Sequence, residues 1–110
     1  NYLIINSIRK YYKYYGDQYK FEFPAGSGNK LNLKQIANEL TKRLLKIFER
    51  NSAGQFQYHH GSQKNWSKDH FKDHHLFYEF FHGDTGQGLG ASHQTGWTAL
   101  IANLLLEIDE

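Results

Sequence analysis

The chain has 110 residues, 39% of them hydrophobic and 22% charged, and a formal net charge of +2. This length and composition predict one modest folded domain, and the small charge gives no indication of a polyanionic partner. Cysteine is absent, which excludes disulfides and favours a reducing, cytoplasmic location without fixing the compartment. No apolar run approaches the roughly 20 residues of a membrane-spanning helix, so no membrane partner is expected. Because methionine is absent and the first residue is Asn1, we expect a processed product, an excised domain or a fragment.

Three ranges place apolar residues at intervals of three and four, as one face of a helix requires: Asn1–Tyr15, Asn32–Arg50 and Ser92–Glu107. The second range opens with a capping-box pattern, because Gln35 follows the candidate N-cap Asn32 after three residues. Gly16-Asp17 supplies a stop for the first helix. The face that we expect this first helix to bury comprises Ile4, Ile8, Tyr11, Tyr12 and Tyr15.

Short extended and irregular segments separate the expected helices. Tyr19–Phe23 alternates aromatic and charged residues, which predicts an extended piece, and Pro24–Gly28 predicts a loop. The aromatic strip Leu76–Phe81 is also expected to be extended, and it leads into a glycine-rich loop that ends at Gly90. These elements predict an all-α fold with short extended insertions.

Glu79 is the carboxylate most indicative of chemistry. If the strip is extended, Glu79 shares a face with Phe77 and Phe81, because successive side chains of a strand alternate between its two faces. A carboxylate among rings is partly desolvated, which raises its pKa unless donors surround it. Glycoside hydrolysis uses such a group as acid or base. The alternative is a solvated glutamate whose neighbouring rings face away from it.

Two blocks of the sequence, Phe77–Gly86 and Gly90–Leu100, resemble the C-terminal segment of family 63 glycoside hydrolases. Three upstream motifs are similar to the same family in order and spacing: Tyr15-Gly16-Asp17, Gly26-Ser27-Gly28 and Leu31-Asn32-Leu33. The resemblance implies that residues 1–110 are the C-terminal fragment of a catalytic domain, forming part of an (α/α)6 barrel. It also implies hydrolysis of α-glucosidic bonds with inversion, without a cofactor.

The resemblance assigns the general base to Glu79 and the general acid to an aspartate upstream of this chain. The chain alone would therefore be inactive. Its partners would be an oligosaccharide or α-glucoside substrate and the remainder of its own catalytic domain. We expect a sugar ring to meet Tyr78, His82 and Trp97, although Trp97 could equally pack in the core. Supporting roles fall to Asp84, in a turn that favours bonds to local amides, and to His93.

Neither a metal site nor a nucleotide loop is predicted. His70, His74 and His75 have helical ligand spacing, but Phe71 stands where a zinc-protease motif has glutamate, so a solvated polar loop is favoured. The glycines at 86, 88 and 90 match neither dinucleotide nor P-loop spacing.

Two other functional classes remain open. Lysines alternate with stackable rings in the range Lys10–Tyr15, as in proteins that bind single-stranded nucleic acid. We favour a structural interpretation, in which the lysines lie on the outer face of the helix and the rings complete its buried stripe. Under this interpretation no nucleic-acid partner is expected. The remaining class is a small helical domain with a purely structural role and no catalysis.

Overall fold

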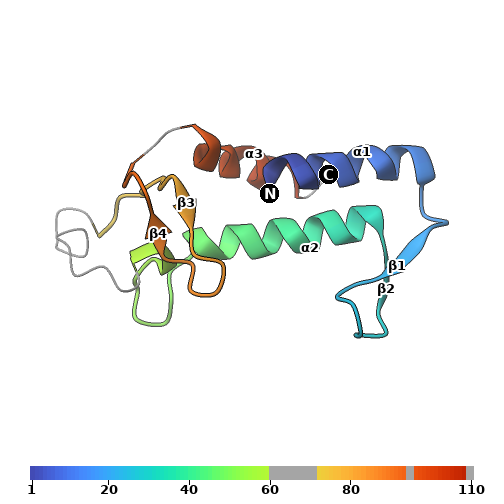
Figure 1. The fold of residues 1–110 in the computed structure, drawn as a ribbon, viewed down its shortest axis with the longest axis horizontal. Coiled ribbons are helices and arrows are strands. Elements are labelled where there is room, and N and C mark those ends of the chain that lie inside the picture. Colours follow the sequence, from blue (N-terminus) through green and yellow to red (C-terminus); the bar gives the residue numbers. More distant parts are fainter. Residues whose placement is uncertain (60–71, 94–95, 109–110) are drawn as a thin grey trace.

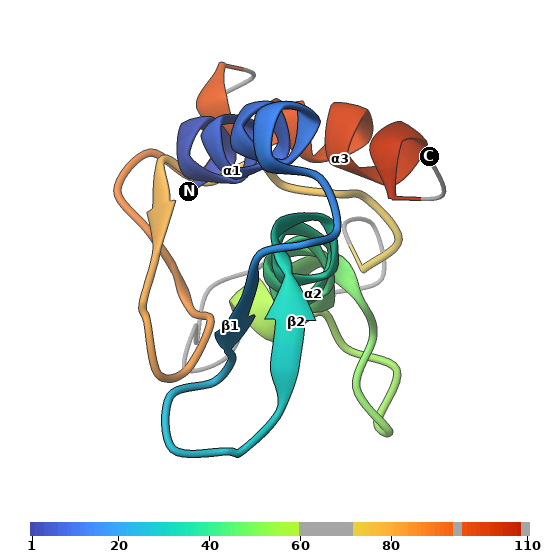
Figure 2. The same cartoon turned by 90° about the vertical axis from the view of Figure 1, so that its right-hand side faces the viewer.

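The computed structural model describes residues 1–59, 72–93 and 96–108 and is dominated by three helices (Figure 1). These are α1 (Tyr2–Tyr15), α2 (Leu33–Leu45) and α3 (Ile101–Glu107). Figures 1 and 2 show α1 and α3 lying side by side on one side of α2. A β-hairpin lies near each end of α2 in Figure 1. Within the described ranges, no helix is both long and apolar enough to cross a bilayer.

The prediction of an all-α partial (α/α)6 barrel is wrong, because the chain also forms two antiparallel two-stranded sheets. Strand β1 (Lys20–Glu22) pairs with β2 (Lys30–Asn32), and β3 (Phe80–Phe81) pairs with β4 (Gly88–Leu89). The fold is therefore a mixture of helices and strands. Strands β2 and β4 fall in segments that the sequence indicated only as a helix cap and a loop.

The first hairpin forms because apolar residues meet across it and glycines reverse the chain. Phe21 lies opposite Leu31 in the register, which gives an apolar cross-strand pair. Gly28 has a positive φ of 75°, a conformation that glycine adopts without steric cost. Its amide donates to Glu22 Oε1 at 2.6 Å and closes the loop. The predicted extended piece at Tyr19–Phe23 is thus confirmed for the three residues of β1.

Helix α1 has the expected bounds but not the expected buried face. It ends at Tyr15 and is capped by Gly16, which has a φ of 64°. Ile5 is buried with Ile8 packed beside it, whereas Ile4 and Tyr11 are exposed. The face of α1 that we predicted to be buried is therefore rotated around the helix relative to the face that is buried, and most of its tyrosine rings lie outside the core.

Helix α2 begins as predicted. Asn32 Oδ1 accepts the Gln35 amide at 2.8 Å, and Gln35 Oε1 accepts the Asn32 amide at 3.0 Å, so the capping box is confirmed. The helix ends earlier than expected, at Leu45, and continues as a 3₁₀ turn (Lys46–Phe48). Arg50 lies beyond the helix, in an isolated bridge with Phe56.

The last helix begins later than the predicted Ser92. A 3₁₀ turn, Trp97–Leu100, precedes α3, and residues 94–95 lie outside the described part of the chain. The glycine at position 96 and the turn together delay the regular helix until Ile101.

The three-helix core contains one buried residue from each helix: Ile5, Ala37 and Leu104. Ala37 is fully buried between the other two. At the edge of this core, the Arg9 guanidinium forms an ion pair with the Glu107 carboxylate. The same guanidinium lies 3.4 Å from the hydroxyl of the fully buried Thr41. This contact joins all three helices through one cation.

A second, aromatic core lies beyond the C-terminal end of α2. Tyr58 is fully buried in it, and its hydroxyl accepts the Leu76 amide at 3.3 Å and donates to the His74 carbonyl at 3.4 Å. Burial raises the pKa of Tyr58 to about 12. The buried members of this aromatic core are Phe56, Tyr58, Leu76 and Tyr78, with Ile47, Phe48 and Phe81 packed against them.

Candidate functional site

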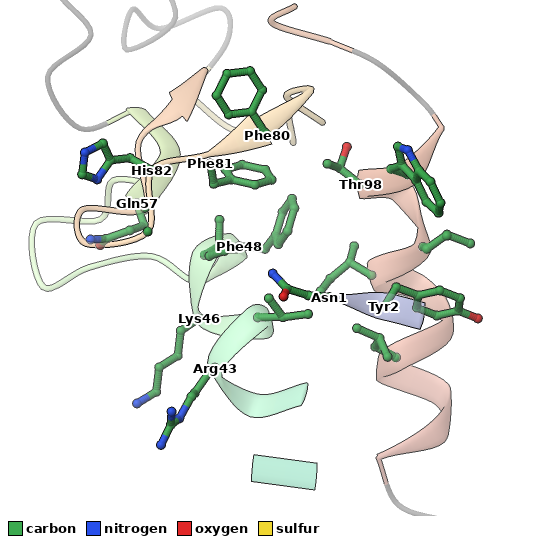
Figure 3. Close-up of a pocket in the computed structure, with 18 of the residues that line it drawn as sticks. Asn1, Tyr2, Arg43, Lys46, Phe48, Gln57, Phe80, Phe81, His82 and Thr98 are labelled. Atoms are coloured by element: carbon green, nitrogen blue, oxygen red, sulfur yellow. The ribbon is translucent and has the colours of Figure 1, made fainter. Parts of the chain in front are cut away.

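A cavity of about 870 Å³ lies where the β3–β4 hairpin faces the ends of the helices (Figure 3). The hairpin contributes residues 79–86 to its wall, and the C-terminal end of α2 with its 3₁₀ turn contributes another part. The first residues of the chain and the segment from Trp97 to Leu104 contribute the remainder, together with Gln57. In Figure 3 the rings of Phe48 and Phe81 point into the space between the hairpin and the helix that carries Thr98.

Glu79 lines this cavity and is held by a two-point contact with Ala91. Its amide donates to the Ala91 carbonyl at 3.0 Å, and its Oε2 accepts the Ala91 amide at 3.2 Å. Within residues 1–59, 72–93 and 96–108, Oε1 has no hydrogen-bond partner. The residue is exposed, so the enclosure among rings that the sequence suggested is not present. The carboxylate is fixed by the backbone rather than by an apolar pocket.

Three glycines at alternate positions bring the strand of β4 close to the site residues. A Cβ on Gly88 would lie inside the van der Waals surface of the Tyr78 ring. A Cβ on Gly90 would lie 2.5 Å from Glu79 Oε2, and Gly90 also has a φ of 73°. Gly86 contacts Gln57 in the same way. These glycines thus allow the backbone to approach three side chains closely, those of Gln57, Tyr78 and Glu79.

His82 shapes the turn of the hairpin. Its Nδ1 accepts the amides of Asp84 at 3.2 Å and Thr85 at 3.4 Å, which places the ring proton on Nε2. In Figure 3 the imidazole lies on the side of the hairpin away from Thr98. The predicted bonding of the Asp84 carboxylate to local amides is not observed, because His82 takes these amides instead. Asp84 Oδ2 lies 4.0 Å from His82 Nδ1, and its side chain is almost fully exposed.

Of the three remaining predicted site residues, one lines the cavity and two lie away from it. Trp97 lines the cavity and is 62% exposed, so it is not a core residue. Tyr78 is buried in the aromatic core and does not line the cavity; burial raises the pKa of its hydroxyl. His93 accepts the Phe77 amide through Nδ1 at 3.5 Å and also lies off the cavity.

Among the cavity-lining residues that sequence reasoning did not assign to the site are Gln57, Phe48 and Phe80. Gln57 lies in a 3₁₀ turn (Gln57–His59), and its Nε2 donates to the Thr85 carbonyl at 2.8 Å. No local sequence pattern indicates this contact, since the two residues are 28 positions apart. Phe48 and Phe80 were noted only as members of apolar runs. Phe48 contacts Phe81 with nearly perpendicular rings, at 5.6 Å between centroids.

The described residues contain no group of three histidine, cysteine, aspartate or glutamate side chains placed to hold a metal ion. Of the histidines considered from the sequence, His70 lies outside the described residues. His75 packs its ring against Phe56 at 4.7 Å between centroids.

Comparison with known proteins gives one strong sequence similarity. The chain is 42% identical over 110 residues to YMR196W, an uncharacterized protein of Saccharomyces cerevisiae. The match covers 98% of this chain but 10% of the yeast protein, so the chain spans about a tenth of that relative's length. No protein-family model matches the chain, and no solved structure matches it. The similarity shows that a segment of this kind occurs in a much longer protein, and it assigns no activity.

Proposed function

We propose that this chain supplies the general-base side of a glycoside hydrolase site, of the inverting α-glucosidase type. Glu79 is the base, and a longer polypeptide provides the general acid. The observation that carries the proposal is the position of Glu79. Its carboxylate lines a cavity of about 870 Å³ beside exposed aromatic rings, and the Ala91 amide fixes one of its oxygens.

The geometry suits proton abstraction from a water molecule. Ala91 holds Oε2, which leaves Oε1 to accept the proton of a water that attacks the anomeric carbon. The general acid protonates the leaving oxygen, and the sugar is released with inverted configuration. Inverting enzymes separate their two carboxyl groups by roughly 6.5–9.5 Å so that this water fits between them. The cavity provides room for both the water and a sugar ring.

The substrate contacts are assigned by exposure. Trp97 and Phe80 are both exposed and both line the cavity, so their flat faces are available to the C–H face of a sugar. Tyr78, His82 and His93 act as supports: Tyr78 packs under Gly88, His82 holds the turn, and His93 holds the aromatic strip. Asp84, exposed at the rim, is available to sugar hydroxyls.

The test is hydrolysis of an α-glucosyl substrate by a full-length protein that carries this segment, with Glu79→Gln compared with Glu49→Gln. Glutamine preserves the volume and the bond from Ala91 but cannot accept the water's proton. Loss of a positioned base lowers the rate by about 10²–10⁴-fold. Glu49, an exposed residue outside the cavity, should be replaceable without effect.

Two results would reject the proposal. Activity of Glu79→Gln within tenfold of the wild type would remove Glu79 from the mechanism. A product released with retained anomeric configuration, seen by NMR in the first minutes of reaction, would exclude the inverting assignment.

A further inference from the structure

Helices α1 and α3 each carry a second apolar stripe that points away from the three-helix core. Ile5 on α1 and Leu104 on α3 both pack with Ala37 of α2. Residues that lie about a quarter to half of the way around each helix from these positions face outward. We call them the outer stripes, and they comprise Ile4, Tyr11, Tyr14 and Tyr15 on α1 and Leu105 and Leu106 on α3.

The outer stripes are strongly exposed. Tyr14 is 83% exposed and Leu106 is 76% exposed. The three tyrosines form a continuous cluster, because Tyr15 contacts Tyr11 at 6.3 Å and Tyr14 at 4.9 Å between ring centroids. Taking about 200 Å² for each fully exposed large side chain, the two stripes together expose on the order of 700 Å². The α1 stripe contributes about two-thirds of this area, so by itself it reaches the roughly 300–600 Å² of the largest patch on a typical monomer, a size that is often functional.

A helix that is apolar on two faces is typical of an element buried on both sides. The core already covers the Ile5 face of α1 and the Leu104 face of α3, so a second layer is needed to cover the outer stripes. The charges on α1 indicate what kind of surface would cover it. The helix contains Lys10 and Lys13 beside its outer stripe and no acidic residue. A covering surface with carboxylates at its margin would match these cations.

We propose that the outer stripes are covered by other elements of the longer polypeptide to which this chain belongs, through an apolar helical surface with an acidic margin. The yeast relative supports this occupant, since the matching segment is 10% of that protein and nine-tenths of its chain is available to cover the stripes. The inference is independent of the catalytic proposal, because none of the outer-stripe residues lines the cavity.

Two other occupants fit less well. Single-stranded nucleic acid would use the rings and lysines of α1, but the stripe on α3 has neither rings nor cations, only Leu105 and Leu106. A second copy of this chain would bring the lysines of two α1 helices together without any acidic residue of α1 to balance them. Both alternatives are outcomes of the experiment.

The test is the rate of maleimide labelling at single cysteines, which this cysteine-free chain allows. Tyr14→Cys and Leu106→Cys probe the stripes, and Ala25→Cys, in the exposed loop of the first hairpin, is the control. Each is made in the 110-residue chain and at the aligned position of full-length YMR196W in which any cysteines of its own have first been replaced. We expect Tyr14→Cys and Leu106→Cys to react at least tenfold more slowly in the intact protein than in the short chain, with Ala25→Cys unchanged.

Several results would overturn the proposal. In the intact protein, labelling of either stripe position as fast as Ala25→Cys would show that the stripe is not covered. If an oligonucleotide then slows that labelling, the stripe is assigned to nucleic acid. In the short chain, labelling of either stripe that slows with protein concentration would assign the stripes to a second copy. Hydroxyl-radical footprinting of unmodified YMR196W at the aligned positions gives the same reading without substitutions, so a variant that fails to fold does not remove the test. None of these measurements uses catalytic activity.

Discussion

The three-helix core and the aromatic core hold one chain together by different means. The first is aliphatic and contains Ile5 and Leu104 packed around Ala37, with the Arg9–Glu107 ion pair at its edge. The second consists mainly of rings from short irregular segments, such as Phe56 and Tyr58, whose centroids lie 5.1 Å apart. The three-helix core is built from regular helices, whereas the aromatic core contains almost no regular helix.

This difference predicts opposite sensitivities. In the three-helix core, a large side chain fills the space between helices, so deletion of its atoms leaves a void. In the aromatic core, glycines allow the backbone of β4 to lie directly on a ring, so addition of atoms creates a clash. The site depends on the second arrangement, because Ala91, two residues after β4, holds Glu79.

Leu104→Ala should have the largest effect on the stability of the 110-residue chain. Leu104 is 1% exposed and contributes the α3 side of the core, so its loss should lower the free energy of unfolding by about 2–5 kcal/mol. Urea denaturation followed by far-UV circular dichroism measures the change. Leu105→Ala, at an exposed position of the same helix, should stay within about 0.5 kcal/mol of the wild type. Equal losses for the two variants would contradict the three-helix core.

Alkaline pH should weaken the aromatic core through Tyr58. Burial raises the pKa of Tyr58 from 10.0 to about 12, so the folded state keeps the phenol proton that the unfolded state releases above pH 10. The contribution of the neutral Tyr58 phenol to the free energy of unfolding is fully present below pH 10. It is lost as the pH rises toward 12, and the loss is about 2–3 kcal/mol. Urea denaturation at a series of pH values between 9 and 12 measures the loss.

Tyr58→Phe is the matched control for this pH dependence. Phenylalanine keeps the ring but loses the hydroxyl bonds to Leu76 and His74, so it should be less stable by about 0.5–1.5 kcal/mol at pH 9. Its stability should still fall above pH 10, because lysines and the other tyrosines titrate in both proteins. The fall should be less steep than in the wild type, because the Tyr58 phenol is missing. Identical slopes would show that Tyr58 is not the group responsible.

Gly88→Ala should disturb the aromatic core while leaving the helices in place. Its new methyl group would enter the Tyr78 ring, and the expected overpacking is about 1–3 kcal/mol. Gly83→Ala is the matched control, because a Cβ there meets nothing within 4 Å. Near-UV circular dichroism, which reports on ring packing, should change for Gly88→Ala alone, and far-UV helix content should change for neither. A shared response would contradict the separation of the two cores.

The sequence predicted the helices because their signals are local and periodic. It did not predict which face of α1 is buried, and the outer stripes explain why: periodicity identifies an apolar face but cannot rank two of them. Ile4 and Ile5 are adjacent and equally apolar, yet only Ile5 is buried. Strands β2 and β4 were missed because two or three residues such as Gly88-Leu89 are too short to show alternation.

The sequence predicted only part of the candidate site, because sequence patterns report on residues that are close together in the chain. Glu79, His82, Asp84 and Trp97 do line one cavity, as expected for residues close in sequence around a turn and a following helix. Their contacts depend on partners that are distant in sequence, which local patterns cannot supply. Tyr78 illustrates this limit, because its neighbours Phe56 and Tyr58 come from a segment about 20 residues earlier and draw it into the core.

The capping box at the start of α2 supports a further prediction of modest size. Asn32→Ala removes the acceptor for the Gln35 amide and also the bond from Asn32 Nδ2 to Asp17 Oδ1 at 2.7 Å, and it should lower stability by about 0.5–2 kcal/mol. Asn32→Ser separates the two contributions, because its hydroxyl still caps the helix but is too short to replace the amide at Asp17. We expect Asn32→Ser to recover most of the loss in urea denaturation. If it is as unstable as Asn32→Ala, the link to Asp17 at the end of α1, rather than the cap, is the interaction that matters.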